Sequence, residues 1–476
     1  MKKEVIGFST LFNNLGETLP FVLIANKYKE SGGEVIFFGS GKKRYIQLVR
    51  DIGCKVIPMR YGPGKKNIKK TVKNKIQREK TFKSYFKEEN YDYYFNAIKK
   101  QVDIIKKYDI KMIVTGFDFL AKISAKIAGI PIVFLTSGAI IPPYYKSKLA
   151  SFPNNFENSI TKLIPKPIKK HIANWYLLNC KWSVKRFNYI AEKFDTPGIN
   201  NFLDLFKGDH NLVAEDINLL GAKPTDHYPK KNYIGPILSY DIASKNKNIL
   251  QKDVNKHLKR SGKSILLTFG SSGDKTIYKQ ILNALNETDF NVIAVYTNIM
   301  EGKKIPEFSD NILLKKIVPS IKKIHELVDL SIIHGGRGTT YTAAYSGKPI
   351  IGIPFQLEQQ VNIDNLVRNG AGVNISRHNF SEEKILDACN RLFSKYDQYL
   401  KNAQELKSKL SEPKGAENAV KRITEILRYE IDKTIITKPD KLKILKAKRQ
   451  RISDSLNIPL ITYKNEEISE KQMKNK

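Results

Sequence analysis

Short apolar runs, each with the length of a buried strand, recur along the whole chain. In the first half they cover residues 5–9, 34–38, 112–115 and 132–135. In the second half the pattern begins again, with runs at residues 264–269, 291–296, 330–333 and 349–353. Stretches of helical periodicity separate the runs in both halves. The sequence therefore predicts an α/β protein with two parallel sheets and helices on both faces.

Helices are recognised by their apolar spacing and by the glycines and prolines near their ends. We expect the first helix to begin near Leu19, because Pro20 suits a first helical turn, and to end at the glycine pair 32–33. A helix of small and apolar residues is expected at residues 120–128, with Gly129 as its stop. In the second half, helices are expected to begin near Lys275, Pro319, Thr339 and Gln360.

Composition divides the chain into four parts. We predict an N-terminal, acceptor-binding domain at residues 1–240 and a C-terminal, donor-binding domain at residues 264–429. The polar and charged residues 241–263 between them are predicted to be a linker. Residues 430–476 form a basic tail with few apolar residues, and we expect its last part to be poorly ordered.

The formal net charge is +35 and the isoelectric point is about 9.7. A surface of this charge attracts polyanions such as anionic lipids or phosphorylated substrates. The chain is rich in Lys, Asn and Ile together, and a biased genome composition would give the same charge, so both explanations stay open. We find no nucleic-acid-binding motif in the sequence, which argues against a nucleic-acid partner.

Three cysteines, Cys54, Cys180 and Cys389, are too far apart for a metal-ligand spacing or a disulfide framework. The sequence has no run of about 18 apolar residues, so no spanning helix is expected. Its first residues read as a strand rather than as a secretion signal. We expect a cytoplasmic protein with reduced thiols, either free or at the inner face of the cell membrane.

The glycine-rich residues 334–340 (HGGRGTT) carry the strongest chemical signal. They follow the apolar run at residues 330–333 and open a helix. Glycines let the backbone approach a ligand, and a helix start at the carboxyl end of a strand exposes N–H groups that suit a phosphate. His334 and the hydroxyls of Thr339 and Thr340 add hydrogen-bond donors. The alternative is a tight turn beside a core histidine.

Residues 334–372 resemble the uridine-diphosphate-sugar family of glycosyltransferases. Their motif is most similar to the bacterial glycopeptide and macrolide branches and to the sterol branch. The matching residues are His334, Gly335, Gly336, Arg337, Gly338, Thr339, Thr340, Gly347, Lys348, Pro349, Pro354, Glu358, Gln359, Asn362, Gly370 and Gly372. The resemblance implies the GT-B fold, which has two facing Rossmann-like domains. It also implies a hexosyltransferase that moves a sugar from a nucleotide sugar, of the uridine diphosphate type, to a hydroxyl acceptor.

The same resemblance implies a donor site, residue by residue. The donor diphosphate is expected at His334, Gly336, Gly338, Thr339 and Thr340. Glu358 and Gln359 are expected to hydrogen-bond the hydroxyls of the donor sugar. Val318 matches a loop that borders the nucleotide base.

Two further features concern the same donor site. Ser271 and Ser272 match a glycine-serine turn near the donor phosphate or sugar, although an ordinary strand-to-helix turn is the alternative for them. Thr342 stands where many members of the family carry a glutamate that holds the ribose, which leaves ribose binding open. Arg337 is expected either to add positive charge beside the diphosphate or to be a plain loop residue.

Transfer with inversion needs a base that takes the proton of the acceptor hydroxyl. In the family this base is a His or Asp three residues before a proline, and Glu17 occupies that position before Pro20. A second acid of the family often stands where this chain has Gly116, so Asp118 is the second candidate. The alternatives are a helix-start carboxylate for Glu17 and a plain loop residue for Asp118. Because no Asp-x-Asp motif is present, we expect no metal ion and no cofactor besides the donor.

Two basic and aromatic regions, residues 65–94 and 144–194, lie in the first half. In the second region six apolar residues roughly follow helical spacing, with lysines between them: Ile172, Trp175, Trp182, Phe187, Ile190 and Phe194. This pattern suits a helix that rests on an anionic membrane. A helix packed on the sheet with a solvated basic face is the alternative. The expected acceptor is a small molecule or a lipid.

Three functions are consistent with the sequence. They are an active glycosyltransferase, a nucleotide-sugar epimerase of the same architecture, and a catalytically inactive accessory or polyanion-binding protein on the same fold. The spacing of Glu358, Gln359 and Asn362 favours the transferase. The unusual Glu17 and the missing acid at Gly116 keep the inactive protein open.

Overall fold

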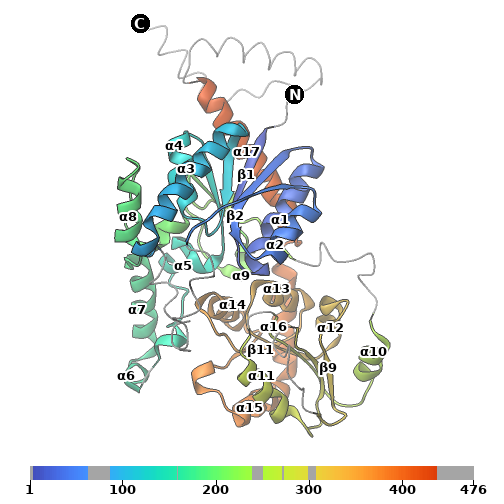
Figure 1. Ribbon diagram of the computed structural model, residues 1–476. Helices are drawn as coiled ribbons and strands as arrows, with labels where there is room; N and C mark the ends of the chain where they lie inside the picture. The colour runs from blue at the N-terminus through green and yellow to red at the C-terminus, as the bar shows by residue number, and fades with distance from the viewer. Residues whose placement is uncertain are drawn as a thin grey trace, which may run out of the picture. The chain divides into compact units, whose positions relative to one another are not determined.

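The computed structural model describes residues 4–62, 86–157, 159–238, 250–270, 273–297 and 307–436 (Figure 1). It divides into two compact units, Met1–Arg422 and Ile423–Lys476. The first unit holds both sheets of the protein. Of the second unit, only the last part of one helix is described.

The first sheet has six parallel strands in the order β3-β2-β1-β4-β5-β6. Its strands are β1 Val5–Phe12, β2 Glu34–Gly41, β3 Lys55–Pro58, β4 Ile110–Thr115, β5 Ile132–Thr136 and β6 His210–Val213. The two central strands, β1 and β4, are buried along almost their whole length. Burial on both faces is expected for a parallel sheet and explains the continuous apolar runs of the sequence.

The second sheet repeats this arrangement, with six parallel strands in the order β12-β11-β10-β7-β8-β9. Its strands are β7 Ser264–Thr268, β8 Asn291–Val295, β9 Ile312–Lys315, β10 Leu330–Ile333, β11 Ile350–Gly352 and β12 Gly372–Asn374. The predicted α/β class with two parallel sheets is confirmed.

Helices connect successive strands in both halves. Those of the first half are α1 Leu15–Glu30, α2 Lys43–Asp51, α3 Tyr91–Lys107, α4 Leu120–Ala128, α5 Pro142–Lys146, α6 Ser159–Lys162, α7 Lys166–Asn179, α8 Val184–Glu192 and α9 Ile217–Leu220. Those that follow are α10 Lys252–Leu258, α11 Lys275–Leu285, α12 Ile321–Leu327, α13 Arg337–Ser346, α14 Leu357–Arg368, α15 Glu382–Ser394, α16 Tyr396–Lys409 and α17 Gly415–Ile436. Short 3₁₀ turns are η3 Glu88–Asn90, η4 Gly138–Ile140, η5 Asn154–Phe156, η6 Phe202–Phe206, η7 Lys230–Asn232 and η9 Arg377–Asn379. In Figure 1, α1 and α2 cover one face of the first sheet and α3 and α4 cover the other.

The expected start of the first helix is wrong. The helix begins at Leu15 rather than near Leu19, because the side chain of Asn14 accepts a hydrogen bond from the N–H of Glu17 and caps it. Pro20 therefore lies inside α1, where it leaves the carbonyl of Gly16 without a helical donor. Glu17 belongs to the first helical turn rather than to a loop.

Other boundaries also differ from the prediction. The predicted linker, residues 241–263, contains α10, while residues 239–249 lie outside the described part of the chain. The basic region at residues 65–94 and the basic tail are described only in part, because residues 63–85 and 437–476 are outside it. The domain boundaries themselves stay predictions.

The single amphipathic helix expected between Ile172 and Phe194 is not formed. Two helices, α7 and α8, replace it, because the chain turns at residues 180–183, where Ser183 adopts a positive φ of 61°. Phe187 and Ile190 are buried in the core of the first half, and Trp182 and Phe194 pack against that core.

Helix α14 joins the two halves of the first unit. Its Val361 is buried in the core of the first half. Its Asn365 accepts a hydrogen bond of 3.1 Å from the hydroxyl of Tyr144, and its Gln360 donates to the carbonyl of Phe152 at 2.9 Å. Its Arg368 donates to the carbonyl of Leu220 at 2.8 Å. A helix of the second half thus completes the packing of the first.

A buried tyrosine provides a second link between the halves. The hydroxyl of Tyr341, on α13, accepts a hydrogen bond of 2.6 Å from the backbone N–H of Asp216 and bonds the carboxylate of Glu215. Both partners lie between β6 and α9 and are themselves buried. Removing the hydroxyl would leave the buried N–H of Asp216 without this acceptor and would take one partner from Glu215, which keeps Arg337 and the N–H of Gly138.

We therefore expect Tyr341→Phe to lower the free energy of unfolding by about 1–3 kcal/mol, the cost of burying unpaired polar groups. Tyr278→Phe is the matched control, because the buried hydroxyl of Tyr278 has no hydrogen-bond partner among the described residues. Denaturant titration of both variants provides the measurement. Equal losses for the two variants would contradict a structural role of the Tyr341 hydroxyl.

Candidate functional site

The glycine-rich segment forms the turn between β10 and α13. His334 follows the last residue of β10, and Gly335 adopts a positive φ of 85° that turns the chain into the helix. Gly336 is the N-cap residue and offers no side-chain cap, so the first helix N–H groups point outward from Arg337 on. The turn lies at the carboxyl end of its parallel strand, the place where open α/β sheets bind ligands. The helix begins two residues earlier than predicted.

Helix α14 fixes this turn from behind. A Cβ atom at Gly335 would lie 2.4 Å from the carbonyl oxygen of Gln359, so only glycine fits there. Asn362 donates a hydrogen bond of 2.9 Å to the carbonyl oxygen of Gly335. The spacing of Gly335, Gln359 and Asn362 in the sequence therefore has a structural reason. Gln359 and Asn362, both on α14, contact Gly335 and hold the glycine-rich turn against that helix.

His334 is buried beside this turn. Its ring packs on Phe269, with centroids 6.1 Å apart, and burial lowers the pKa of the imidazole to about 4. The ring is therefore neutral at pH 7. Its Nδ1 and the Oγ1 of Thr340 are buried, and neither has a hydrogen-bond partner within the described ranges. Buried polar atoms without partners are rare in proteins. Their position at the helix start fits a donor phosphate.

Arg337 lies between two carboxylates instead of projecting as a plain loop residue. It bonds Glu358 at 3.0 Å and forms an ion pair of 3.6 Å with Glu215. Burial raises the pKa of Glu215, and the positive charge of Arg337 opposes that rise. The arginine thus links the first residues of α13 to α14 and to the segment after β6.

Glu215 was missed in the sequence analysis. It stands two residues after the end of the short strand β6, at the carboxyl end of a parallel strand. A pair of acids in that position, Glu215 and Asp216, is the signal that could have drawn attention to it.

Glu358 and Gln359 differ in their surroundings. Glu358 lies in the first turn of α14 and is partly exposed, and its Oε1 pairs with Arg337. Gln359 is buried, and its Oε1 accepts a hydrogen bond of 2.8 Å from the N–H of Phe355. The side chain of Gln359 therefore holds its own loop, whereas the carboxylate of Glu358 remains accessible.

Glu17 carries a strongly perturbed carboxylate. Burial raises its pKa to about 7, a hydrogen bond with Asn14 opposes the rise, and the negative charge of Glu358 adds to it. Its Oε2 is buried and has no hydrogen-bond partner among the residues described. The structure thus brings Glu17 within electrostatic reach of Glu358 from the other half of the unit, a pairing that the sequence did not reveal.

Asp118, the second candidate, lies in a different environment. Its Oδ2 accepts hydrogen bonds from the hydroxyls of Ser9 and Tyr61 and from the side-chain amide of Gln101, at 2.8 Å for Gln101. Burial raises its pKa, and these three hydrogen bonds oppose the rise. The carboxylate of Asp118 thus accepts three hydrogen bonds and links Ser9, Tyr61 and Gln101 in the interior of the first half.

The remaining predicted positions are placed as follows. Ser271 and Ser272 lie outside the described residues. Val318 is partly buried and packs against a hydrophobic cluster of the second half, the half to which it belongs. Its neighbour Ile317, in the loop after β9, is 67% exposed. Thr339 and Gly338 lie in the exposed first turn of α13, and the hydroxyl of Thr342 donates to the carbonyl of Gly338 at 2.7 Å.

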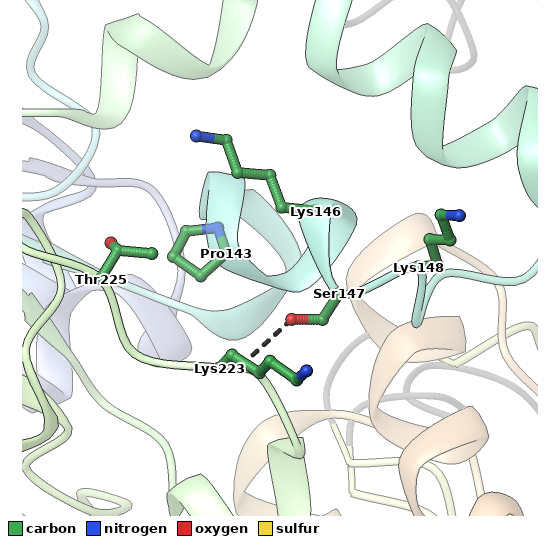
Figure 2. Close-up of a pocket in the computed structure, with 6 residues that line it drawn as sticks. All are labelled: Pro143, Lys146, Ser147, Lys148, Lys223 and Thr225. Carbon is green, nitrogen blue, oxygen red and sulfur yellow. Dashed lines mark hydrogen bonds between the residues drawn. The ribbon is translucent and has the colours of Figure 1, made fainter.

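A basic pocket of about 320 Å³ lies elsewhere, beside α5. Figure 2 shows its lining, which consists of Pro143, Lys146, Ser147, Lys148, Lys223 and Thr225. The N–H of Lys223 donates to the hydroxyl of Ser147 at 3.1 Å and so holds the two segments together. The three ammonium groups point in different directions in Figure 2 and do not converge on one anion. None of the predicted donor residues lines this pocket.

Across the described residues, no group of three His, Cys, Asp or Glu side chains is placed to hold a metal ion. The three cysteines are buried and free. No helix in the described ranges has both the length and the apolar character needed to cross a membrane.

Comparisons with known proteins show what the chain as a whole is similar to. Residues 279–426 match the family described as "Erythromycin biosynthesis protein CIII-like, C-terminal domain". The chain is 23% identical over 347 residues to the "PGL/p-HBAD biosynthesis rhamnosyltransferase" of Mycobacterium bovis (strain BCG / Pasteur 1173P2), covering 70% of this chain and 73% of that protein.

Solved structures match over most of the chain. The glycotransferase of kitacinnamycin has a TM-score of 0.62 at 15% identity, covering 89% of this chain and 99% of that one. The spinosyn rhamnosyltransferase SpnG, solved with thymidine diphosphate, has a TM-score of 0.55 at 13% identity, covering 89% of this chain and 100% of that one. The fold is therefore GT-B, and the resemblance inferred from residues 334–372 is confirmed.

Substitutions at two glycines of this turn should distinguish its role in folding from its role in ligand binding. Gly335→Ala should lower the free energy of unfolding by about 1–3 kcal/mol, because it combines a positive φ with a contact of 2.4 Å to the Gln359 carbonyl. Gly338→Ala should leave stability unchanged or raise it by up to about 1 kcal/mol, since a Cβ there meets nothing within 4 Å and alanine favours helix.

The Gly338→Ala variant should nevertheless bind a nucleoside diphosphate more weakly, because the methyl group would stand where the phosphate approaches the first turn. Thermal unfolding with and without uridine diphosphate measures both effects. Normal nucleotide binding by Gly338→Ala would place the diphosphate away from this turn.

Proposed function

We propose that this chain, a glycosyltransferase of the GT-B fold, transfers a hexose-type sugar from a nucleotide sugar to a hydroxyl acceptor, with inversion and without a metal ion. The donor is of the uridine diphosphate type, with the thymidine type as its nearest alternative, since a structural neighbour was solved with thymidine diphosphate. The observation that carries the proposal is the carboxylate of Glu17. It has a pKa of about 7 and an unpaired oxygen, and it feels the charge of Glu358 on the donor half.

In the proposed reaction the acceptor oxygen attacks the anomeric carbon of the sugar while the bond from that carbon to the diphosphate oxygen breaks on the opposite side. Glu17 takes the proton of the acceptor hydroxyl. A carboxylate with a pKa near the working pH is well matched to this task. Because Oε2 of Glu17 has no partner among the described residues, it is free to accept the proton.

The leaving diphosphate gains negative charge, which the start of α13 is arranged to meet. The unpaired N–H groups after Gly336 and the positive end of the helix dipole supply most of this stabilisation. The hydroxyls of Thr339 and Thr340 and the neutral imidazole of His334 supply further hydrogen bonds. All of these groups are fixed before the donor arrives, so little reorganisation is needed during the reaction.

Glu358 is proposed to accept hydrogen bonds from the donor-sugar hydroxyls. Arg337 orients it through the contact of 3.0 Å, and Glu215 in turn holds the arginine. Gln359 acts mainly through its backbone and its bond to Phe355, so we assign it a positioning role in the donor loop.

A screen of nucleotide sugars by thermal unfolding tests the proposal. A donor at a hundred times its dissociation constant should stabilise the protein by about 2.7 kcal/mol. The stabilising donor is then incubated with hydroxyl acceptors and without them. Sugar attached to an acceptor supports transfer, interconversion of nucleotide sugars without an acceptor indicates an epimerase, and no turnover of any donor indicates an inactive accessory protein.

Substitutions of the residues proposed to bind the two ends of the donor should distinguish the diphosphate contacts from the sugar contacts. His334→Ala should weaken free nucleoside diphosphate and nucleotide sugar equally, because the imidazole faces the shared diphosphate. Glu358→Gln should weaken only the nucleotide sugar, by about 1.5–3 kcal/mol for lost hydrogen bonds to a charged group. Calorimetric titration of both ligands provides the measurement. Unchanged nucleotide affinity in His334→Ala would remove the histidine from the site.

Glu17→Gln should lower turnover by about a hundred- to ten-thousand-fold and leave donor affinity almost unchanged. In the wild type the rate should fall as the pH drops through about 7, because the protonated carboxyl cannot accept a proton. The variant should lose this dependence. Glu30→Gln, the same change near the other end of α1, where Glu30 pairs with Lys27, is the matched control and should keep normal turnover.

The same variant has a stability signature. Because the folded pKa of Glu17 lies above the ordinary value of 4.5, the folded protein loses stability as the pH rises from about 4.5 to 7. Glu17→Gln should therefore be more stable than the wild type at pH 8, by at most about 3 kcal/mol, and similar to it near pH 4. Normal turnover together with this gain in stability would show a buried but non-catalytic carboxylate.

A further inference from the structure

A group of large apolar side chains is exposed around α6 and α7. We call this group the apolar ridge, and it consists of Phe156, Ile160, Leu163, Ile168, Ile172, Trp175 and Tyr176. Its most exposed members are Leu163, Ile160 and Trp175, at 85%, 76% and 60%. Single exposed apolar residues are normal on protein surfaces, but contiguous ones mark interaction sites. In Figure 1, α6 and α7 run along the left-hand edge of the first unit.

Helix α7 is apolar on two faces. Ala173 and Leu177 are buried on the inner face, where α7 contacts α5 and η6. Ile168, Ile172 and Trp175 follow a spacing of four and three residues and form a stripe on the outer face. The inner face is sufficient to attach the helix to the protein. The outer stripe therefore has no role in folding of the first unit.

The exposed charges around the ridge are positive. Lys166 and Lys170 are exposed beside the outer stripe. Glu157 is the single acidic residue in the sequence from Phe156 to Tyr176, and it forms an ion pair of 3.1 Å with the buried Lys169. An apolar stripe flanked by lysines, with its one acid neutralised, complements a surface that is apolar inside and anionic at its boundary.

We propose that the apolar ridge rests on an anionic lipid bilayer, with its apolar side chains inserted between the headgroups and its lysines against lipid phosphates. The binding surface differs from the one expected from sequence, since Trp182, Phe187, Ile190 and Phe194 pack in or against the protein core. A second copy of the chain is a poorer occupant, because two ridges face to face would bring their lysines together.

The experiment uses the full chain and vesicles of phosphatidylglycerol and phosphatidylcholine, compared with vesicles of phosphatidylcholine alone. The protein should sediment with the mixed vesicles about tenfold more strongly than with the neutral ones, and added salt should reduce the difference. Binding is the readout, so the result does not depend on whether the chain transfers sugar.

Ile160→Asp combined with Leu163→Asp should abolish vesicle binding, and both sites are exposed enough for the fold to persist. Ile127→Asp combined with Leu327→Asp is the matched control, because these side chains are also exposed but lie outside the ridge. The control should bind as the wild type does. Thermal unfolding of both double variants checks that the fold is intact.

The chain's two tryptophans, Trp175 and Trp182, give a local probe. In a Trp182→Phe background the fluorescence of Trp175 should shift to the blue when anionic vesicles are added, because its ring enters the headgroup region. No shift, equal binding to neutral vesicles, or equal binding by the ridge and control variants would overturn the proposal. A dimer in solution that the ridge variant dissolves would also overturn it and would assign the ridge to a second copy.

Discussion

The carbonyl oxygen of Gln359 lies so close to Gly335 that a single added carbon would collide with it. This contact presses the turn before α13 against α14, and Asn362 closes it from the side. The same helix carries Glu358 into the site and places Val361 in the core of the first half. One helix therefore positions the glycine-rich turn, the carboxylate of Glu358 and part of the core of the other half of the unit. Glycines in this motif serve packing as much as ligand access.

The candidate site is rich in carboxylates, although the chain as a whole carries a large positive charge. The chain carries a formal +35, but the site places the carboxylates of Glu215 and Glu358 against one guanidinium, and the charge of Glu358 also acts on Glu17. Glu358 raises the pKa of both other acids, and Arg337 offsets this for Glu215. Burial first, and then the charge of Glu358, therefore keeps Glu17 a stronger base than an exposed glutamate. Global charge thus says little about the chemistry of a buried site.

The sequence predicted the sheets well, because strands buried on both faces read as continuous apolar runs. It also predicted α4, since Gly129 adopts the left-handed conformation that ends the helix. It failed at α1, where the weight given to Pro20 hid the capping signal of Asn14 followed by Glu17. Local cues compete at such a boundary, and here the N-cap hydrogen bond of Asn14 accompanies the earlier start of the helix.

The sequence predicted the site only in the part that a single continuous segment of the chain forms. The turn at residues 334–340 is local, so its chemistry could be read directly. The pairing of Arg337 with Glu215 joins residues far apart in sequence, and no spacing rule reveals it. The Oε1 of Gln359 accepts a hydrogen bond from the N–H of Phe355, a contact that the sequence did not reveal, while its predicted contact with the donor sugar stays a prediction. Such long-range and reciprocal contacts depend on the assembled fold.

The neutral state of His334 affects how donor binding should depend on pH. With a pKa of about 4 in the empty site, the imidazole is uncharged when the donor arrives. Under the proposed contact, a diphosphate beside the ring raises this pKa, so donor capture is linked to uptake of a proton and becomes tighter in acid. Glu17 works in the opposite direction, since it must have lost its proton to act. Under the proposed roles, donor capture and proton transfer would therefore favour opposite sides of the pH scale, because the buried His334 and the partly buried Glu17 would respond to pH in opposite directions.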